Sequence, residues 1–442
     1  MSKENSPKIF IIKQIVKILP LLSKKNLITL VRLYEKIAND RTKEIIVAIG
    51  NILETTPAGD MIIRDLKLLN PKCREKLFTT LIAEGLILRD EKRAKAEEEG
   101  RSVPFTILIS PTMRCNLRCR GCYAYNYSKK DDLSYEILDR IVTEAEEIGV
   151  ALITILGGEP LVMPDLFKLY ENHPNMYFQF FCNGTLMTKE TAEKLAKLGN
   201  VAVMFSIEGF KKETDERRGD GVYEKVLKAM DTLREAGVPF GYSTAVTNLN
   251  ESVVSSDEFV DLMLDKGALL GWYFLYMPVG KDPDLSLMPT PEQRLHLLEA
   301  DKRIRATKQM FIIDFWNDAP FVGGCIAAKY YIHITSNGDV EPCIFTHLAQ
   351  DNIKDKSLKE IMESEYFRKL RAKQPYDKNL YLPCQWIDHP EVSRELYKEL
   401  KLKLTHPGAD DILTRGDLKE GIDKYSVKVK EIYKDKWEGF KK

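Results

Sequence analysis

The feature of this chain that most restricts its fold is an alternation of strand-like and helix-like segments that begins at residue 104. Short apolar runs alternate with longer segments in which apolar residues recur at helical spacing. The six strand candidates are FTILIS (105–110), ALITIL (151–156), MYFQFF (176–181), VAVMFS (201–206), FGYSTAV (240–246) and GWYFLYM (271–277). Apolar strands joined by helical crossovers indicate a parallel sheet covered on both faces. We therefore predict an α/β protein built on a partial (β/α)6 barrel of the TIM type.

The regions on either side of this alternation follow different patterns. Residues 1–90 predict helices, and the charged run RDEKRAKAEEEGR (89–101) predicts a linker. Beyond residue 310, YYIHITSNGDVEPC (330–343) predicts a β-hairpin that turns at Asn337-Gly338. The helices expected outside the barrel cover residues 8–19, 25–39, 42–55, 72–84, 356–372, 391–403 and a pair within 412–442. We expect an all-helical N-terminal domain with its linker, the barrel, a small α+β domain and a helical tail, at residues 1–100, 101–309, 310–405 and 406–442.

The loop after the first strand carries three of the eight cysteines, Cys115, Cys119 and Cys122, in the spacing C-x3-C-x2-C. Barrels of this type bind their ligands at the carboxyl ends of the strands, where this loop lies. Zinc would need a fourth Cys or His nearby, and none stands in the next forty residues. An iron–sulfur cluster tolerates a missing protein ligand when a substrate or cofactor takes its place. The spacing therefore favours an iron–sulfur cluster over zinc.

Four further motifs each follow a later strand: GGEP (157–160), SIEGF…TDERRGDGVY (206–223), TAVTN (244–248) and YMPVG (276–280). Together with the cysteine loop they resemble, in order, the motifs of the radical S-adenosylmethionine (radical SAM) superfamily. The resemblance implies a [4Fe–4S] cluster held by the catalytic cysteines Cys115, Cys119 and Cys122, with S-adenosylmethionine chelating the remaining iron. It also implies cofactor contacts from Tyr123, Gly157, Gly158, Glu159, Ser206, Arg218, Thr247 and Met277.

The same resemblance suggests which part of the cofactor each of these residues contacts. The two glycines of GGEP would let the backbone approach the ligand, and Glu159 would face the methionine ammonium group. Arg218 would pair with the methionine carboxylate, and Ser206 would lie at the ribose or the carboxylate. Many members have an aromatic residue immediately before the third cysteine, where this chain has Gly121. We expect Tyr123 to take part of that role at the adenine.

A second group of cysteines, Cys325, Cys343 and Cys384, lies late in the chain. Its opening, C-x12-G-x4-C with Gly338 at the hairpin turn, resembles the start of a SPASM domain, although the later CxxCxxxxxCxxxC array is absent. We predict one auxiliary [4Fe–4S] cluster on these three residues, which makes two clusters in all. A zinc site and unliganded cysteines are the alternatives. The candidates for the fourth ligand are His347, Asp388, His389, water and the substrate.

The resemblance implies an enzyme that cleaves S-adenosylmethionine with one electron and abstracts hydrogen from an unactivated C–H bond through a 5′-deoxyadenosyl radical. A low-potential ferredoxin or flavodoxin would supply that electron. Because residues 1–90 lack the β-wing of a peptide-binding domain and are basic and apolar, a lipid or other hydrophobic substrate is favoured. A peptide- or protein-modifying maturase is the alternative, and a non-catalytic iron–sulfur electron carrier is the alternative of another class.

Composition restricts partners and location. Sixty-six basic residues balance 66 acidic ones, so charge favours no nucleic-acid partner. Lysines interrupt every apolar run near the N-terminus, which argues against an export signal and for a reducing, cytoplasmic setting without disulfides. Residues 8–36 form a basic amphipathic pattern that suits either packing on the protein or peripheral contact with an anionic membrane surface.

Overall fold

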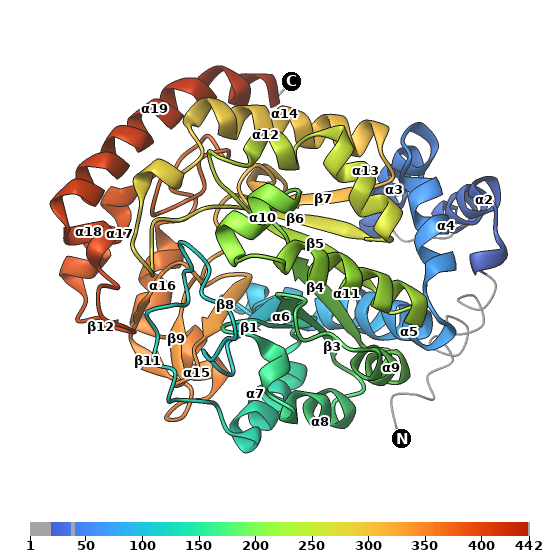
Figure 1. The fold of residues 1–442 in the computed structure, drawn as a ribbon, viewed down its shortest axis with the longest axis horizontal. Helices are drawn as coiled ribbons and strands as arrows, with labels where there is room; N and C mark the ends of the chain where they lie inside the picture. Colours follow the sequence, from blue (N-terminus) through green and yellow to red (C-terminus); the bar gives the residue numbers. More distant parts are fainter. Residues whose placement is uncertain (1–18, 37–39, 441–442) are drawn as a thin grey trace.

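The computed structural model describes residues 19–36 and 40–440, and its centre is one ten-stranded sheet (Figure 1). Seven neighbouring strands run parallel in chain order, which confirms the α/β class and the partial barrel. The six predicted strands are β1 (Thr106–Ile109), β2 (Leu152–Ile155), β3 (Tyr177–Cys182), β4 (Val201–Ser206), β5 (Phe240–Val246) and β6 (Leu270–Leu275). Their carboxyl ends lie along one edge of the sheet because the strands are parallel.

Helices connect these strands and pack on one face of the sheet (Figure 1). Several begin at a Ser or Thr whose hydroxyl accepts a hydrogen bond from the first turn, as Ser134 does from the Ile137 amide. Several also end at a glycine with positive φ, such as Gly149. They are α7 (Tyr135–Ile148), α8 (Asp165–Asn172), α9 (Lys189–Leu198), α10 (Lys211–Arg218), α11 (Val222–Ala236), α12 (Glu251–Val254), α13 (Asp257–Lys266) and α14 (Pro291–Thr307).

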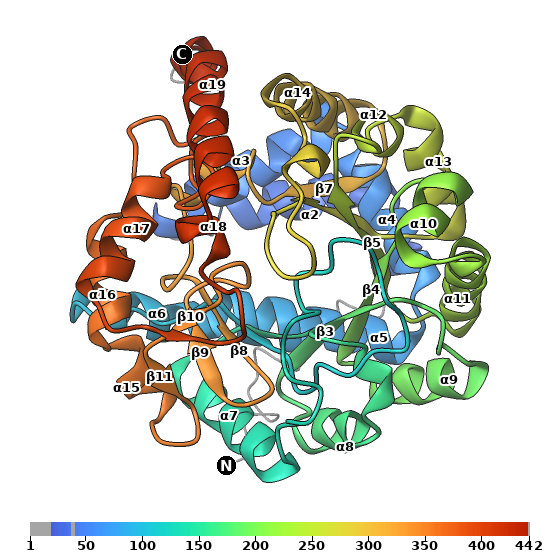
Figure 2. The same ribbon diagram turned by 60° about the vertical axis from the view of Figure 1, so that its left-hand side comes forward.

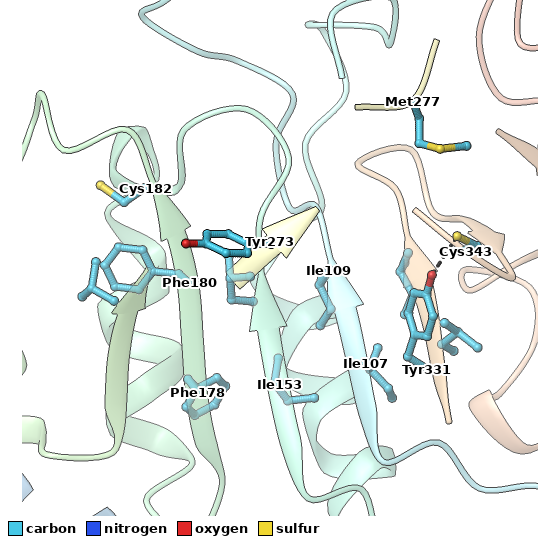
Figure 3. Close-up of a cluster of buried hydrophobic side chains, with 14 of the residues drawn as sticks. Ile107, Ile109, Ile153, Phe178, Phe180, Cys182, Tyr273, Met277, Tyr331 and Cys343 are labelled. Atoms are coloured by element: carbon cyan, nitrogen blue, oxygen red, sulfur yellow. Dashed lines mark hydrogen bonds between the residues drawn. The ribbon is translucent and has the colours of Figure 1, made fainter. Parts of the chain in front are cut away.

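Both faces of the sheet are buried, as the continuous apolar strands predict. Phe178 and Phe180 of β3 lie with Ile153 of β2 in the core beneath the crossover helices (Figure 3). On the opposite face, Tyr177 and Met204 pack against the π-helical segment η3 (Leu77–Leu88). The N-terminal region therefore covers the sheet face that the crossover helices leave open.

The sheet continues beyond the six predicted strands at both edges. Strand β7 (Phe311–Asp314) pairs parallel with β6, and β8 (Tyr331–Ile334) pairs parallel with β1, with Thr106 opposite Tyr331. The predicted hairpin is confirmed, because β9 (Asp339–Glu341) runs antiparallel to β8 after the turn at Gly338. Segments on both sides of residue 309 thus share one sheet, and the division of the chain into domains stays a prediction.

The N-terminal helices differ in part from the prediction. The charged run expected as a linker forms helix α6 (Arg89–Glu98), because buried Arg89 donates hydrogen bonds to the carbonyls of Val150 and Asn175. Helix α4 (Ala58–Leu68) was not predicted, and the predicted helix 8–19 lies almost entirely outside the described residues. The other elements here are η2 (Leu19–Leu21), α2 (Lys24–Glu35), α3 (Asp40–Thr55) and α5 (Pro71–Lys76).

The C-terminal helix α19 runs beside α14 (Figure 1). Among the described residues, no helix is both long and apolar enough to cross a membrane. The remaining elements are η4 (Pro160–Val162), η5 (Leu285–Leu287), η6 (Ala319–Val322), β10 (Leu348–Ala349), β11 (Asp351–Asn352), α15 (Leu358–Met362), α16 (Glu365–Ala372), α17 (Pro390–Glu399), β12 (Lys403–Leu404), α18 (Asp411–Thr414) and α19 (Gly416–Phe440).

Candidate functional site

The first cysteine set, Cys115, Cys119 and Cys122, lies on the loop that leaves the carboxyl end of β1. The Leu133 amide donates to the Pro111 carbonyl at 2.9 Å and closes the base of this loop. Cys115 is exposed, and the other two cysteines are half-buried. Burial raises the pKa of the Cys122 thiol, and the neighbouring Cys119 adds to that rise. The set therefore faces a partly open region at the ligand-binding edge of the sheet.

The GGEP turn packs directly on the cysteine loop. The Gly158 amide donates to the Thr112 carbonyl, and the Glu159 amide donates to the Arg114 carbonyl, both at 2.9 Å. A Cβ atom on Gly158 would lie 2.0 Å from the Arg114 carbonyl oxygen. Gly157 has φ +105°, a conformation that favours glycine. The backbone of the cysteine loop itself thus requires both glycines, a reason that the sequence did not reveal.

Glu159 joins three segments around this turn. Its buried carboxylate accepts hydrogen bonds from the amides of Leu161, at 3.1 Å, and Asn183, at 2.8 Å. Burial raises the pKa of Glu159, and these hydrogen bonds oppose that rise. The Asn183 side chain in turn donates to Asn116 Oδ1 at 2.8 Å and lies 3.9 Å from Cys115 Sγ. Glu159 therefore fixes the position of the first cysteine as well as its own turn.

A buried carboxylate with two arginines lies on the other side of the loop. Glu208 Oε1 accepts hydrogen bonds from Arg217 Nη1, at 2.5 Å, and from Arg218 Nε, at 2.7 Å. Burial alone would raise the pKa of Glu208, but the two guanidinium groups outweigh it and hold that pKa below its usual value. Arg218 also lies close enough to Cys119 and Cys122 for their charges to act on it. The predicted Arg218 is thus placed beside the first cysteine set.

The other predicted cofactor residues follow neighbouring strands along the same edge. Ser206 ends β4 and is half-buried, whereas Thr247 and Met277 are buried just after β5 and β6. Thr247 is held by the side chain of Asn250, which accepts a hydrogen bond from its amide at 2.7 Å. The structure therefore gathers every predicted segment of the first site at one edge of the sheet.

The aromatic residues at this edge are arranged differently from the expectation. Tyr123 is half-buried, and its ring meets the ring of Phe345 edge-on, with the centroids 6.2 Å apart. The ring of Tyr276 instead lies against Gly121, where a Cβ atom would approach Tyr276 Cε2 to 2.6 Å. Tyr276 thus lies beside the position where the family pattern has its aromatic residue.

The second cysteine set, Cys325, Cys343 and Cys384, lies between the β8–β9 hairpin and the segment before α17. Burial raises the pKa of each of the three thiols to about 12. At each thiol the negative charge of one other cysteine of the set adds to this rise. Thiolates are soft ligands that bind iron or zinc, whereas magnesium and calcium prefer oxygen ligands such as carboxylates.

The protein candidates for the fourth ligand of this set already have partners. Asp388 forms a fully buried ion pair with Arg294, whose Nη1 lies 2.5 Å from Asp388 Oδ1. His347 Nδ1 is 2.7 Å from Nε2 of His406, and His389 Nε2 is 3.1 Å from the Leu382 carbonyl oxygen. Over residues 19–36 and 40–440, no three His, Cys, Asp or Glu side chains are arranged to hold a single metal ion. In a [4Fe–4S] cluster each thiolate binds a different iron, so such convergence is not required.

A buried polar chain connects the two cysteine sets. Tyr127 of the first loop donates to Glu341 Oε1 at 2.7 Å, and Glu341 Oε2 lies 2.6 Å from His333 Nδ1. His333 Nε2 is 2.7 Å from Ser110 Oγ, directly after β1. Figures 1 and 2 show the teal first loop beside the orange hairpin that these contacts join. Buried hydrogen bonds therefore join the segments that carry the two sets.

Several residues of the site were missed by the sequence analysis. Glu208, Arg217 and Asn183 stand within or beside quoted motifs, but only their tertiary partners reveal them. An acidic residue in an otherwise apolar strand end, as in SIEG, was the one available signal for Glu208. Cys73 and Cys182, expected as buried small side chains, are indeed almost inaccessible to solvent.

Comparison with known proteins supports this architecture. Residues 109–261 match the radical SAM superfamily, and residues 325–385 match SPASM, an iron–sulfur cluster-binding domain. An AdoMet-dependent heme synthase of Methanosarcina barkeri is 27% identical over 300 residues, which cover 61% of this chain and 85% of that protein. The mycofactocin maturase MftC of Mycobacterium tuberculosis is 29% identical over 296 residues, which cover 63% and 75% of the two chains.

Solved structures share the fold. Streptococcus suis SuiB, bound to its precursor peptide SuiA, superposes with a TM-score of 0.53 at 21% identity, over 67% of this chain and 70% of that one. SuiB has also been solved bound to S-adenosylmethionine. At this level of identity the likeness concerns the fold alone.

Proposed function

Because the chain belongs to the radical SAM superfamily and carries a SPASM-type iron–sulfur domain, we propose that it is an enzyme that modifies a peptide. The observation that carries the proposal is the convergence of the cysteine loop, the GGEP turn and the Glu208–Arg218 pair at the carboxyl edge of the sheet. The cofactors of this family are S-adenosylmethionine and [4Fe–4S] clusters, and three thiolates with no fourth protein ligand fit them.

We assign the first cluster to Cys115, Cys119 and Cys122 and the auxiliary cluster to Cys325, Cys343 and Cys384. With S-adenosylmethionine bound, the first cluster would supply the electron that cleaves it to methionine and a 5′-deoxyadenosyl radical, which would take hydrogen from the substrate. The protein's own residues bind and orient the cofactor around that chemistry. Following the family pattern, we assign to the cofactor pocket Gly157, Gly158, Glu159, Ser206, Thr247 and Met277. For the aromatic contact with the adenine, Tyr276 joins Tyr123 as a candidate.

Arg218 is the proposed partner of the methionine carboxylate. Its Nε and Nη2 atoms are both engaged by Glu208 Oε1, which leaves Nη1 to bind an external carboxylate. Glu208 also accepts a hydrogen bond from the Ala245 amide at 3.1 Å, so this pair is anchored to β5. Glu208 therefore acts as a positioning residue that holds Arg218 in a single orientation.

A peptide substrate replaces the lipid favoured by the sequence. That earlier preference rested on the basic, apolar N-terminus and on the absence of a β-wing. Relatives named as maturases, MftC and the sporulation killing factor maturation protein SkfB, favour the peptide alternative, as does SuiB with its precursor peptide. The heme synthase relatives make a tetrapyrrole the competing substrate class.

Cofactor cleavage tests the first part of the proposal. Anaerobically reconstituted protein with dithionite and S-adenosylmethionine should release 5′-deoxyadenosine, measured by liquid chromatography and mass spectrometry. The Cys115→Ala/Cys119→Ala/Cys122→Ala variant is the control and should release none. No release from the native chain would reject the enzyme. Replacing dithionite by a reduced ferredoxin or flavodoxin tests the proposed class of electron donor.

Substrate fractions test the second part. Peptide, lipid and tetrapyrrole extracts from cells that lack the protein are each incubated with the reconstituted enzyme. We expect the peptide fraction to stimulate 5′-deoxyadenosine formation and to contain a peptide whose mass changes only with the active enzyme. Stimulation by the lipid or tetrapyrrole fraction alone would replace the peptide with that class.

We further propose peripheral membrane contact through residues 8–36, within a cytoplasmic setting. The support is that Leu30, Leu33 and Tyr34 of α2 are exposed on a helix that also carries lysines. A Leu33→Ser/Tyr34→Ser variant should sediment less with anionic vesicles than the native chain does. Equal sedimentation of the two proteins would reject the contact.

A further inference from the structure

A tyrosine hydroxyl is directed at the second cysteine set. Tyr331, the first residue of β8, donates a hydrogen bond to Cys343 Sγ across 2.7 Å (Figure 3). Its ring is 2% exposed and meets Phe315 edge-on, with the centroids 5.6 Å apart. The parallel pairing of β8 with β1 fixes its backbone. The hydroxyl is therefore held in place by packing on several sides.

This hydroxyl differs from the donors that the other cysteines share. The backbone amide two residues downstream donates to the sulfur of Cys115, Cys343 and Cys384, each time at 3.4 Å. Cys343 adds to this amide a tyrosine hydroxyl at 2.7 Å. The backbone pattern is common to both sets, so the hydroxyl belongs to the second set specifically.

This hydroxyl is able to donate. The phenol of tyrosine is protonated at neutral pH, because its ordinary pKa is about 10. A second tyrosine, the half-buried Tyr376, lies beside Cys325 and is linked to it by a side-chain hydrogen bond. Two phenols thus accompany the three thiols, whereas guanidinium groups accompany the first set.

Hydrogen bonds to cluster sulfurs raise the reduction potential of an iron–sulfur cluster, because they stabilise the more negative reduced state. We propose that Tyr331 is a positioning residue that raises the reduction potential of the auxiliary cluster by donating its hydroxyl proton to a hydrogen bond with the Cys343 thiolate. Reduction adds one electron to the cluster, and the hydroxyl keeps its proton throughout. The inference rests on the auxiliary cluster of the proposed function.

A redox titration tests this role. The full chain with Cys115→Ala/Cys119→Ala/Cys122→Ala isolates the auxiliary cluster, and Tyr331→Phe is added to that background. At a fixed solution potential near the midpoint, we expect the ratio of reduced to oxidised cluster, measured by electron paramagnetic resonance, to fall about threefold or more. Pulsed measurement of the proton couplings before and after exchange into deuterated water should show one strongly coupled exchangeable proton fewer in Tyr331→Phe.

Tyr366→Phe is the matched control, because Tyr366 is also buried near Cys343, yet its hydroxyl has no hydrogen bond to a cysteine among the described residues. Its reduced fraction and proton couplings should equal those of the background. An unchanged reduced fraction in Tyr331→Phe with iron retained would overturn the inference while leaving the cluster assignment intact. Loss of iron from Tyr331→Phe but not from Tyr366→Phe would also overturn it, in favour of a role in assembly. A background protein without iron would reject the auxiliary cluster of the proposed function instead.

Discussion

The two cysteine sets of this protein provide the same number of thiols in different surroundings. Cys115 of the first set is exposed on a loop, and Arg218 lies beside that set. In the second set Cys343 is buried and Cys325 and Cys384 are half-buried, burial raises the pKa of its thiols to about 12, and a tyrosine hydroxyl contacts Cys343. An exposed thiol with arginines beside it suits a site that exchanges a cofactor bearing a carboxylate group, whereas a buried thiol suits a permanently bound group. The exposure of Cys115 and the burial of Cys343, more than the number of thiols, distinguish the two sets.

A buried carboxylate–arginine pair accompanies each set. Glu208 pairs with Arg217 and Arg218, whose side chains remain 17% and 11% exposed. Asp388 pairs with Arg294, and neither side chain is exposed. Asp388 also accepts a hydrogen bond from the Cys384 amide at 2.9 Å. The pair at the second set is therefore a fixed part of the fold, and the pair at the first set retains access to solvent.

The largest expected difference between the sets concerns cofactor cleavage. Replacing Cys115, Cys119 and Cys122 by alanine should abolish 5′-deoxyadenosine release. Replacing Cys325, Cys343 and Cys384 should leave that release measurable, because the first set is intact. Each triple variant should retain about four of about eight irons per chain. Iron analysis checks the counts, and retention of no iron by either variant would contradict two independent sites.

The ion pairs should differ in their contribution to stability. Asp388→Asn leaves a fully buried guanidinium unpaired and should lower the free energy of unfolding by about 3–5 kcal/mol. Glu208→Gln should cost less, about 2 kcal/mol, because its arginines reach water. Urea denaturation of the metal-free protein measures both values. Asp90→Asn, which removes an exposed partner of Arg93, is the control and should change stability by less than about 1 kcal/mol. Equal losses of unfolding free energy in Asp388→Asn and Glu208→Gln would contradict the expected difference between the two ion pairs.

A substitution in the GGEP turn should affect the first cysteine set and leave the second set intact. A Gly158→Ala side chain would collide with the Arg114 backbone and should lower the free energy of unfolding by about 2 kcal/mol. The displaced loop should lose the iron of the first set, and the second set should keep its own. Gly416→Ala, at the start of α19, adds a Cβ with no atom within 4 Å and serves as the control. Iron content and urea denaturation are the two measurements, and full iron in Gly158→Ala would contradict the role of the turn.

The smallest expected effect is a difference in thiol reactivity. In the metal-free protein at pH 8, iodoacetamide should label Cys115 at least about tenfold faster than Cys343. The reason is that Cys115 is exposed, whereas burial raises the pKa of Cys343 to about 12 and reduces its thiolate fraction. Peptide mass spectrometry over time measures the rates, with urea-unfolded protein as the control in which both react alike. Equal labelling rates for Cys115 and Cys343 in the folded protein would contradict the burial of Cys343.

The sequence predicted what depends on local pattern. Strand and helix alternation located β1 to β6, and the Asn337-Gly338 turn located the hairpin, because both signals lie within short segments. The short runs that form β7 and β8 could not be assigned to this sheet, since their partners are distant in the chain. Helix α6 was mistaken for a linker because its charges were taken as solvated, whereas Arg89 is buried.

In the candidate site, too, local sequence features were predicted and contacts made by tertiary packing were not. The spacing of the cysteines and the order of the motifs identified the segments that meet at the carboxyl edge. The partners that fix them, Glu208 on Arg218 and Asn183 beside Cys115, arise only from tertiary packing. The predicted role of the GGEP glycines at the cofactor stays a prediction, and the structure adds their close packing against the backbone of the cysteine loop.

The pairing of Thr106 with Tyr331 has a consequence for how the protein is made. One edge of β1 has no strand beside it until the ribosome has synthesised residue 331, long after the first cysteine loop has emerged. Contacts so distant in sequence form late in folding, because closing the long intervening chain carries an entropic cost. The strand that anchors the first cysteine loop therefore reaches its final surroundings only when the second hairpin exists. The segments that carry the two cysteine sets thus complete their packing together, near the end of synthesis.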